Sequence, residues 1–176
     1  LADKTNVKNT ATVCEFEDEL GATYDIKIEF AGYRRRTDAF LNLDMAEAVP
    51  QDIPAFVEKI KDVDVVIFAG GISPQLEGEE MAVSAPGFRG GDRDDIELPA
   101  IQRETIAALK KAGKKVVLVN FSGSALALEP ETKNCDAILQ AWYPGQEGGS
   151  ALADVLYGEA APSGKLPITF YRSVNQ

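Results

Sequence analysis

The pattern of hydrophobic and polar residues changes near residue 50. Before that point, three segments have the alternation or the β-branched content of strands, at residues 10–16, 24–30 and 39–45. In the second segment every other residue is apolar, which is typical of an antiparallel strand with one buried face. Three such strands cannot bury a good core by themselves. We therefore interpret residues 1–48 as the tail of an incomplete β module.

After residue 50, helical and strand patterns alternate. Helices are predicted at residues 52–61, 99–111 and 148–157, and strands at residues 63–68, 115–120, 136–142 and 165–170. The run at 63–68 is nearly all apolar, as expected for a central parallel strand. Pro167 places the last strand at a sheet edge, because proline cannot donate to the strand ladder. The alternation predicts an α/β fold, a mostly parallel sheet sandwiched by helices, with the short antiparallel β segment at the N-terminus.

Three unusual loops follow three of the predicted parallel strands: GGISPQLEGEE, FSGSALAL and YPGQEGG. Right-handed crossovers bring the carboxyl ends of parallel strands to one rim of the sheet, where α/β proteins bind ligands. The first loop holds Glu77, Glu79 and Glu80. Neighbouring carboxylates raise one another's pKa, which makes a proton donor available near neutral pH. The plain alternative is a solvated acidic loop.

Composition narrows the possible chemistry. The formal net charge of −10 argues against nucleic acids and anionic membranes as partners, and no apolar run is long enough to span a bilayer. The chain has no histidine, which excludes a Ser-His-Asp triad within it. Gly70-Gly71 lacks a nucleotide-binding motif around it, and the spacing of the acidic residues does not match a calcium loop. We therefore expect neither a cofactor nor a metal site.

Ordered motifs extend from about residue 62 to the end of the chain. They are VDVVIFAGGI with SPQLEGEEM, then GGDRDDIELPAIQRETIAAL, KKVVLVNFSGSAL and YPGQEGGSALADVLYGEAAPSGKLPITF. These motifs resemble the C-terminal α/β-sandwich domain of glycoside hydrolase family 3, whose members include β-glucosidases and β-xylosidases. The loop AGGISPQLEGEE is closest to the β-xylosidase-like branch. Residues 49–176 are accordingly assigned to this domain. GATYDIKIEFAG with AFLNLDM resembles the end of a protective-antigen-type β-sandwich, inserted in some members.

The resemblance implies a retaining, exo-acting β-glycosidase that removes terminal β-glucosides or β-xylosides from oligosaccharides or polysaccharides. In the family, the nucleophile is an aspartate on an N-terminal barrel domain, in a Ser-Asp-Trp-like motif that this sequence lacks. The acid/base is a glutamate on the α/β domain. In the xylosidase-like pattern IEAE, Leu76-Glu77 matches the first Ile-Glu and Glu79 matches the second glutamate. Glu77 is the first candidate for the acid/base, Glu79 the second and Glu80 the third.

The partners implied are a glycoside substrate and the barrel domain of the same polypeptide, and this chain alone is expected to be nearly inactive. The resemblance to this family also implies a periplasmic or extracellular location. The alternative function is a non-catalytic carbohydrate-binding or scaffolding domain, in which the glutamate loop only shapes a pocket.

Other rim residues have a structural and a functional interpretation. Asp92-Arg93 is expected to anchor its loop by an ion pair rather than to contact sugar, and Trp142 to pack at a strand end rather than to stack on a sugar ring. Asn120 and Ser122 are plausible polar neighbours of the acidic loop.

Overall fold

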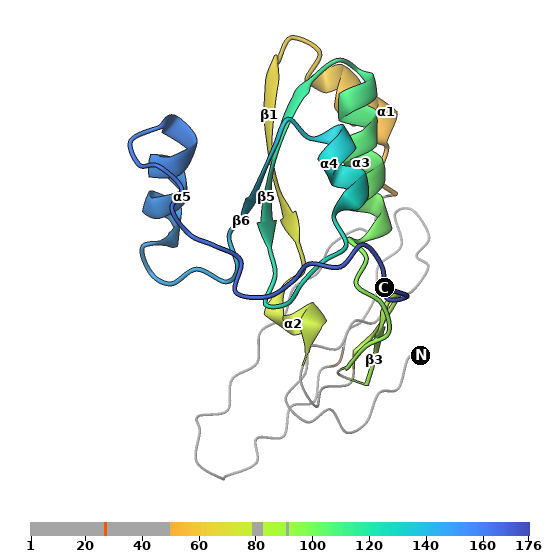
Figure 1. Cartoon of the computed structure of the whole chain (residues 1–176). Helices are drawn as coiled ribbons and strands as arrows, with labels where there is room; N and C mark the ends of the chain where they lie inside the picture. The colour runs from red at the N-terminus through yellow and green to blue at the C-terminus, as the bar shows by residue number, and fades with distance from the viewer. Residues whose placement is uncertain (1–26, 28–49, 79–82, 91) are drawn as a thin grey trace. The chain divides into compact units, whose positions relative to one another are not determined.

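The structure, a computed structural model, describes residues 27, 50–78, 83–90 and 92–176 (Figure 1). The chain divides into two compact units, Leu1–Gln51 and Asp52–Gln176. The predicted strands at 10–16, 24–30 and 39–45 lie outside the described residues, apart from Lys27. The assignment of residues 1–48 to a β module therefore stays a prediction. Every helix and strand with known bounds belongs to the second unit.

A parallel sheet forms the centre of the second unit. Its strands are β1 (Val65–Gly71), β5 (Lys115–Phe121) and β6 (Ala137–Gln140), in the order β1-β5-β6. Val65 pairs with Lys115, and the register continues without interruption to Gly71 and Phe121. The predicted parallel strands are thereby confirmed, and their carboxyl ends lie at one end of the sheet.

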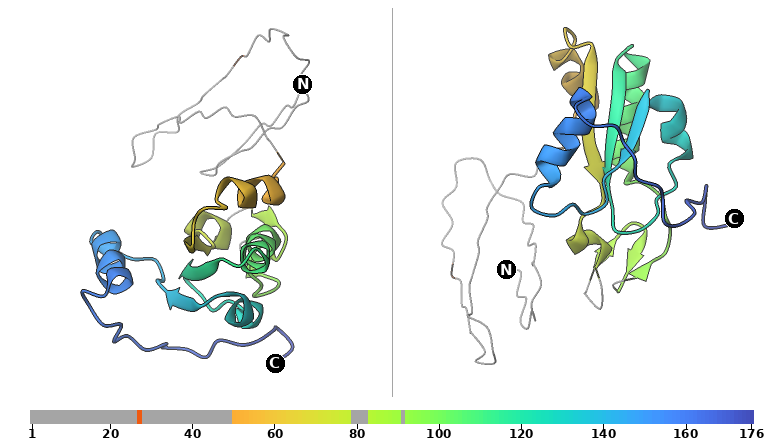
Figure 2. Two further views of the ribbon diagram at one scale, coloured as in Figure 1. Left: turned by 90° about the horizontal axis from the view of Figure 1, so that it is seen from above. Right: turned by 60° about the vertical axis from the view of Figure 1, so that its left-hand side comes forward.

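Helices lie on both sides of this sheet (Figures 1 and 2). One face carries α1 (Ile53–Lys59), α3 (Ala100–Lys111) and α4 (Glu129–Asn134), and α5 (Gly148–Tyr157) lies on the other side. A small antiparallel sheet is formed by β2 (Ser84–Ala85), β3 (Phe88–Arg89) and β4 (Asp92–Arg93). The predicted α/β fold, a parallel sheet between helices, is confirmed. The short elements α2 (Pro74–Glu77) and α4 were not predicted.

The helices begin and end for local chemical reasons. The Asp52 side chain accepts a hydrogen bond from the Ala55 amide at 2.9 Å and so caps α1, whose first turn tolerates Pro54. Helix α3 is followed by Gly113 at φ 79°, a backbone conformation that favours glycine. Both boundaries agree with the sequence pattern within two residues.

The core lies between the sheet and the helices α1, α3 and α4 that cover one of its faces. Its buried members are Ile72, Phe88, Leu98, Ile106, Leu109, Val116, Leu118 and Leu126. Val116 and Leu118 alternate along β5, and Ile106 and Leu109 repeat at helical spacing along α3. Ile101, predicted on the same apolar side of α3, is instead 45% exposed. Burial of this one layer positions the strands and hence the loops that follow them.

Two predictions about the sheet were wrong. Residues 165–170 do not form a strand: Leu166 and Ile168 are about half exposed, and Pro167 between them has no amide hydrogen for a ladder. Strand β1 is not central in the described sheet, because β5 lies between β1 and β6. Exposed and partly buried residues alternate along β1, and Val65 and Ile67, on its less covered face, are 49% and 50% exposed.

A buried ion pair fixes α4 against α3. The Glu131 side chain is fully buried, and its Oε1 accepts a hydrogen bond from Arg103 Nε at 2.9 Å. The same guanidinium donates to the Ala127 carbonyl at 2.8 Å and forms an ion pair with Glu97. Burial alone lowers the pKa of Arg103, but its bonds to Glu131 and Glu97 outweigh that effect and raise it. Arg103 thus joins α3 to the segment before it, through Glu97, and to the end of the β5–α4 loop and α4, through Ala127 and Glu131.

We expect Glu131→Ala to lower the free energy of unfolding of the chain by about 2–4 kcal/mol, because it removes the buried partner of Arg103. Glu129→Ala removes an exposed carboxylate from the same helix, and its expected effect is about 0.5 kcal/mol or less. Urea unfolding at pH 7 measures both. Equal effects of the two variants would show that the buried pair does not stabilise the fold.

Candidate functional site

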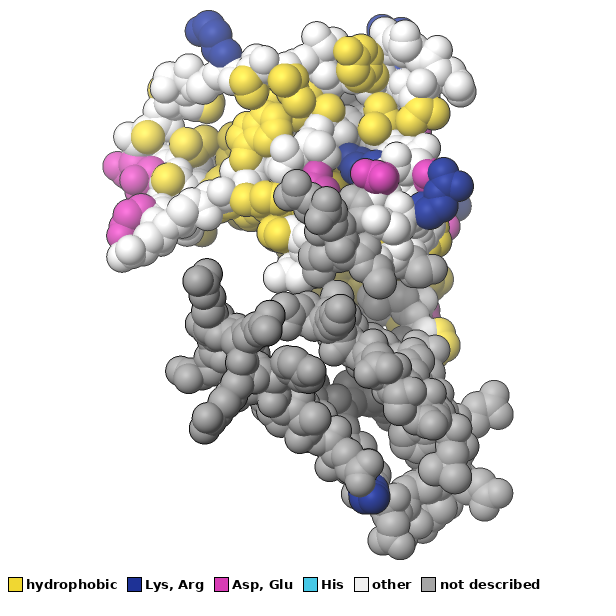
Figure 3. Space-filling view, turned by 90° about the horizontal axis from the view of Figure 1, so that it is seen from below, with side chains coloured by type: hydrophobic (Ala, Val, Ile, Leu, Met, Phe, Trp, Pro, Cys, Tyr) yellow, Lys and Arg dark blue, Asp and Glu magenta, His cyan; other side chains and the backbone are white. Residues whose placement is uncertain are grey.

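The loops after β1, β5 and β6 meet at one carboxylate, that of Glu77. This confirms the predicted common rim, since the residues that contact Glu77 are Gly123 and Ser124 after β5 and Tyr143 after β6. Viewed from below, this end of the unit shows acidic and basic side chains close together beside an apolar area (Figure 3). The candidate site is the group formed by these four residues and Arg93.

The short helix α2 places Glu77. Ser73 caps this helix, with its Oγ accepting a hydrogen bond from the Leu76 amide at 3.1 Å, and Pro74 occupies the first turn. Gly78 ends the helix at φ 57°, a conformation that favours glycine. Glu77 is therefore the last helical residue, held at a fixed point just beyond the strand.

Both oxygens of the Glu77 carboxylate accept hydrogen bonds. Oε2 accepts from the Gly123 amide at 3.0 Å and from the Tyr143 hydroxyl at 2.6 Å, and Oε1 accepts from Ser124 Oγ. The Tyr143 oxygen also lies 3.1 Å from the Ile72 carbonyl oxygen, but its single hydrogen favours the shorter contact with the carboxylate. One side chain thus joins all three rim loops.

Arg93 orients the donor on Ser124. Its guanidinium donates to Ser124 Oγ at 2.8 Å and to the Ala125 carbonyl at 3.0 Å, and it lies 5.6 Å from the centre of the Phe88 ring. Because Ser124 Oγ accepts from Arg93, its own hydrogen is left to donate to Glu77. Arg93 Nε and Nη2 are buried and have no hydrogen-bond partner in the described part of the chain.

These contacts set the protonation states of the site. Burial by itself raises the pKa of Glu77, but the hydrogen bonds from Ser124, Tyr143 and Gly123, with the charge of Arg93, outweigh it and lower the pKa. Burial and the neighbouring Glu77 raise the pKa of Tyr143 to about 12. At neutral pH the site therefore pairs an ionised carboxylate with a phenol that keeps its proton.

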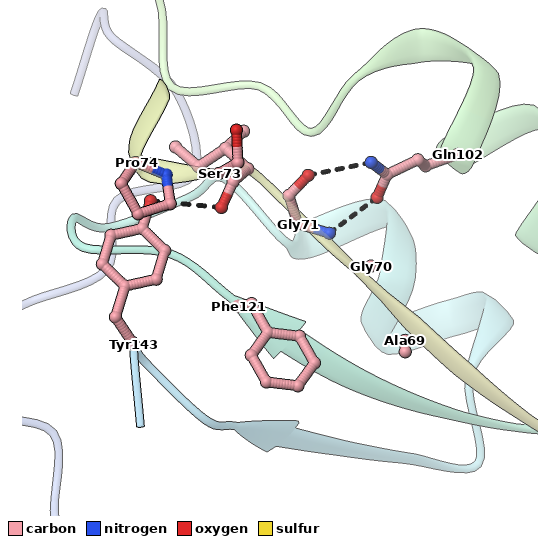
Figure 4. Close-up of a pocket in the computed structure, with 9 residues that line it drawn as sticks. Ala69, Gly70, Gly71, Ser73, Pro74, Gln102, Phe121 and Tyr143 are labelled. Atoms are coloured by element: carbon pink, nitrogen blue, oxygen red, sulfur yellow. Dashed lines mark hydrogen bonds between the residues drawn. The ribbon is translucent and has the colours of Figure 1, made fainter. Parts of the chain in front are cut away.

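A shallow, open pocket of about 380 Å³ lies beside this site (Figure 4). Gln102 closes one side of it, where its amide group donates to the Gly71 carbonyl at 2.8 Å and accepts from the Gly71 amide at 2.7 Å. A side chain at position 71 would place its Cβ 1.9 Å from the Phe121 carbonyl oxygen, and the Gly71 φ is 121°. Gly71 thus belongs both to the strand and to the pocket wall.

The predicted site residues have different outcomes. Glu77 lies at the centre of the rim, whereas Glu79 and Glu80 lie outside the described residues. Among the described residues Arg93 does not form the ion pair expected to anchor its loop, and its guanidinium instead donates to Ser124 and to the Ala125 carbonyl. Trp142 packs edge-to-face on Phe170, with ring centres 5.8 Å apart, which agrees with its packing interpretation.

Asn120 and Ser122 are fully buried at the carboxyl end of β5. Asn120 Nδ2 donates to Gln140 Oε1 at 2.6 Å, and Gln140 Nε2 donates to Ser122 Oγ at 3.1 Å. They contact one another and Gln140 rather than Glu77, so they stabilise the strand ends beneath the rim.

The sequence placed on the rim both the loop of Gly123 and Ser124 and the loop of Tyr143. It did not identify these three residues as partners of Glu77. The signal that could have found them is their position, one to four residues beyond a predicted strand. Among the residues that the structure describes, no group of three or more His, Cys, Asp or Glu side chains is arranged to hold a metal ion, and no helix is long and apolar enough to cross a membrane.

Residues 4–176 match the family model described as "Glycosyl hydrolase family 3 C-terminal domain". A xylan 1,4-beta-xylosidase of Xylanibacter ruminicola is 51% identical over 95% of this chain and 19% of its own length. A periplasmic beta-glucosidase of Salmonella typhimurium is 45% identical over 78% of this chain and 17% of its own length. The chain therefore spans less than a fifth of these relatives.

Solved structures agree with the sequence comparisons. The beta-glucosidase from Kluyveromyces marxianus in complex with glucose aligns with a TM-score of 0.62 and 31% sequence identity, over 74% of this chain and 15% of that one. The beta-glucosidase from Listeria innocua in complex with gluconolactone aligns with a TM-score of 0.60 and 29% identity, over 73% of this chain and 16% of that one.

We expect Glu77 to make the stability of the chain depend on pH. Its pKa is lowered by folding, so its contribution is fully present above the pKa of the unfolded chain, about 4.3, and is lost as pH falls through the lower folded value. Urea unfolding of wild type and Glu77→Gln should therefore differ most at pH 6–7, and the difference should shrink below about pH 4.5.

Glu104→Gln is the control for the removed charge, because Glu104 is an exposed residue of α3. If the difference between wild type and Glu77→Gln grew as the pH fell, the hydrogen bonds at Glu77 would not favour its ionised form.

Proposed function

The chain belongs to glycosyl hydrolase family 3, whose C-terminal domain it matches over residues 4–176, and from this premise we propose a function for the rim. We propose that the domain is part of a retaining, exo-acting β-glycosidase and supplies its general acid/base glutamate. The loop after β1 carries that glutamate, with Glu77 and Glu79 as candidates. The nucleophilic aspartate lies on an N-terminal barrel domain outside this chain.

The observation that carries the proposal is the position of the acidic loop. It begins at the carboxyl end of β1, and the loops after β5 and β6 hold Glu77 there through Gly123, Ser124 and Tyr143. A general acid must be held at a fixed distance from the nucleophile, about 5–5.5 Å between the two carboxyl groups of a retaining enzyme. A loop tied at its base can present a carboxyl group to a second domain with that precision.

Such a site would work in two steps. In the first, the glutamic acid of the loop protonates the glycosidic oxygen while the aspartate of the barrel bonds to the anomeric carbon, and the alcohol leaves. In the second, the same glutamate, now a carboxylate, takes a proton from water, whose oxygen displaces the aspartate. The anomeric configuration is retained because the carbon is inverted twice.

The substrates that we propose are terminal β-xylosides or β-glucosides. The support comes from similar proteins, which are named a xylan 1,4-beta-xylosidase and a periplasmic beta-glucosidase. The greater identity to the first, 51% against 45%, favours xylosides. The second name also motivates a periplasmic or extracellular location for the polypeptide, which fractionation of expressing cells would test. Enzyme confined to the cytoplasm would contradict it.

The test uses the full-length polypeptide with both candidates replaced, Glu77→Gln/Glu79→Gln. We expect kcat/KM for phenyl β-xyloside, a poor leaving group, to fall by a factor of ~10² or more, because no acid remains to protonate the oxygen. The 2,4-dinitrophenyl β-xyloside, which needs no protonation, should still form the glycosyl-enzyme. Initial rates with both substrates, and with the matching β-glucosides, measure the effect and the sugar preference.

Glu104→Gln is the matched control, and the 176-residue chain alone should show no turnover. Wild-type rates of the double variant on both leaving groups would refute the acid/base role of this loop. The domain would then be a non-catalytic carbohydrate-binding or scaffolding module.

A further inference from the structure

Gln102 closes the free edge of β1 at the residue where that strand ends. Among the described residues, β1 pairs with β5 on one side and with no strand on the other. The Asp64 carbonyl and the Ile72 amide bond to β5 at 3.0 Å and 2.8 Å, so even-numbered positions face β5 and the backbone groups of Gly71 face outward. The Gln102 side-chain amide bonds to both of those groups, as a residue of a neighbouring antiparallel strand would (Figure 4).

We infer that Gln102 is a positioning residue, whose amide fixes the end of β1 and, through it, the start of the loop that carries Glu77 to the rim. The inference rests on the proposed function, because the segment that is positioned is the proposed acid/base loop. Gln102 has no part in proton transfer itself and acts only through the backbone of Gly71.

The chain from Gly71 to the rim is short. Ile72 follows Gly71 and is buried in the core, and Ser73 then caps α2, which Glu77 ends. A shift of Gly71 would therefore pass through a single residue into the helix that places Glu77.

The backbone of Gln102 is itself well fixed. Gln102 is the third residue of α3, a helix that contributes buried side chains to the core. The next residue, Arg103, is bonded to Glu131 and to the Ala127 carbonyl. A side chain that starts from such a rigid backbone can hold a strand end with the precision that proton transfer to a substrate oxygen needs.

Glycines leave room for the contacts of the rim at two points. A Cβ at position 123 would lie 2.6 Å from Glu77 Oε2 and 2.7 Å from Tyr143 Cε2. A Cβ at position 70 would lie 2.6 Å from Gln102 Oε1 and would displace the amide. The pair Gly70-Gly71 thus has a role that is independent of nucleotide binding, because Gly70 leaves space for the amide and Gly71 bonds to it.

The amide affects position more than stability. The pocket beside Gln102 is open, so water can bond to the backbone groups of Gly71 once the amide is removed. Water satisfies those groups without holding them at a fixed point. Loss of the amide should therefore leave the domain folded but misplace the loop after β1, which slows the step in which that loop protonates the glycosidic oxygen.

The test uses the full-length polypeptide with Gln102→Met, which keeps the length of the side chain but has no amide. We expect kcat/KM to fall by ~10-fold or more for phenyl β-xyloside and by less than about threefold for 2,4-dinitrophenyl β-xyloside, because only the first needs the acid. Trapping with a 2-deoxy-2-fluoro-β-xyloside measures the concentration of competent enzyme, so that a smaller folded fraction cannot imitate this result. The matching β-glucosides replace these substrates if the enzyme prefers them.

Gln102→Glu tests the two hydrogen bonds themselves. While ionised, the new carboxylate can accept from the Gly71 amide but has no hydrogen for the Gly71 carbonyl, and once protonated it can make both bonds. Of the described residues that line the pocket, only Tyr143 has an acidic proton, which it keeps because its pKa is about 12. On the phenyl substrate, kcat/KM of Gln102→Glu relative to wild type should therefore rise as the pH falls from 7 to 4.5, toward the ordinary pKa of a glutamic acid, about 4.3.

The relative kcat/KM of Gln102→Met should not rise over the same pH range. Gln51→Met and Gln51→Glu are the matched controls at an exposed position and should match wild type throughout. An equal fall on both substrates or wild-type rates in Gln102→Met would overturn the inference, as would a flat pH dependence of Gln102→Glu relative to wild type.

The proposed function is judged separately, by Glu77→Gln/Glu79→Gln. If that variant selectively loses the substrate with the poor leaving group and Gln102→Met does not, the function stands and the inference is wrong. Wild-type rates of the double variant would refute the function itself. If Gln102→Met does not fold, the pH dependence of Gln102→Glu decides.

Discussion

The candidate site depends on one constraint, the common direction of β1, β5 and β6. Parallel strands end on the same side of the sheet, so three loops far apart in the sequence must leave it together. Chain direction alone would leave those loops near one another but independent. The carboxylate of Glu77 joins them, because it accepts hydrogen bonds from Gly123 in the loop after β5 and from Tyr143 in the loop after β6. The fold supplies the meeting point, and a single charged side chain makes it rigid.

A second carboxylate, which is fully buried, holds a donor side chain deeper in the domain. Glu131 holds Arg103 in the interior, and Arg103 also binds the Ala127 carbonyl at the end of the loop that follows β5. That loop is therefore fixed at both ends, at Ser124 by Glu77 and Arg93 and at Ala127 by Arg103. Polar contacts of this kind impose a defined geometry on a loop that apolar packing alone would hold loosely.

Most of the helices and strands could be predicted from the sequence, because the pattern that predicts each one lies within its own segment. Apolar runs predicted the parallel strands, and apolar residues at helical spacing predicted α1 and α3. The helix α4 escaped prediction because EPETKN has no apolar periodicity, and its buried Glu131 depends on an arginine 28 positions away. Residues 165–170 contain strand-forming residues but pair with no strand in the described part of the chain. The partners of Glu77 could not be predicted individually. The spacing of strands along the sequence shows which loops lie on the rim, but not which groups in those loops donate hydrogen bonds to Glu77.

The close contact at Gly123 has an evolutionary consequence. Its missing side chain leaves the space that the Glu77 carboxylate and the Tyr143 ring occupy. A larger residue at 123 would meet both of those side chains, so it is accommodated where they shift or have become smaller. The three positions therefore form an epistatic unit, and related sequences should change them jointly, although they lie in three separate loops.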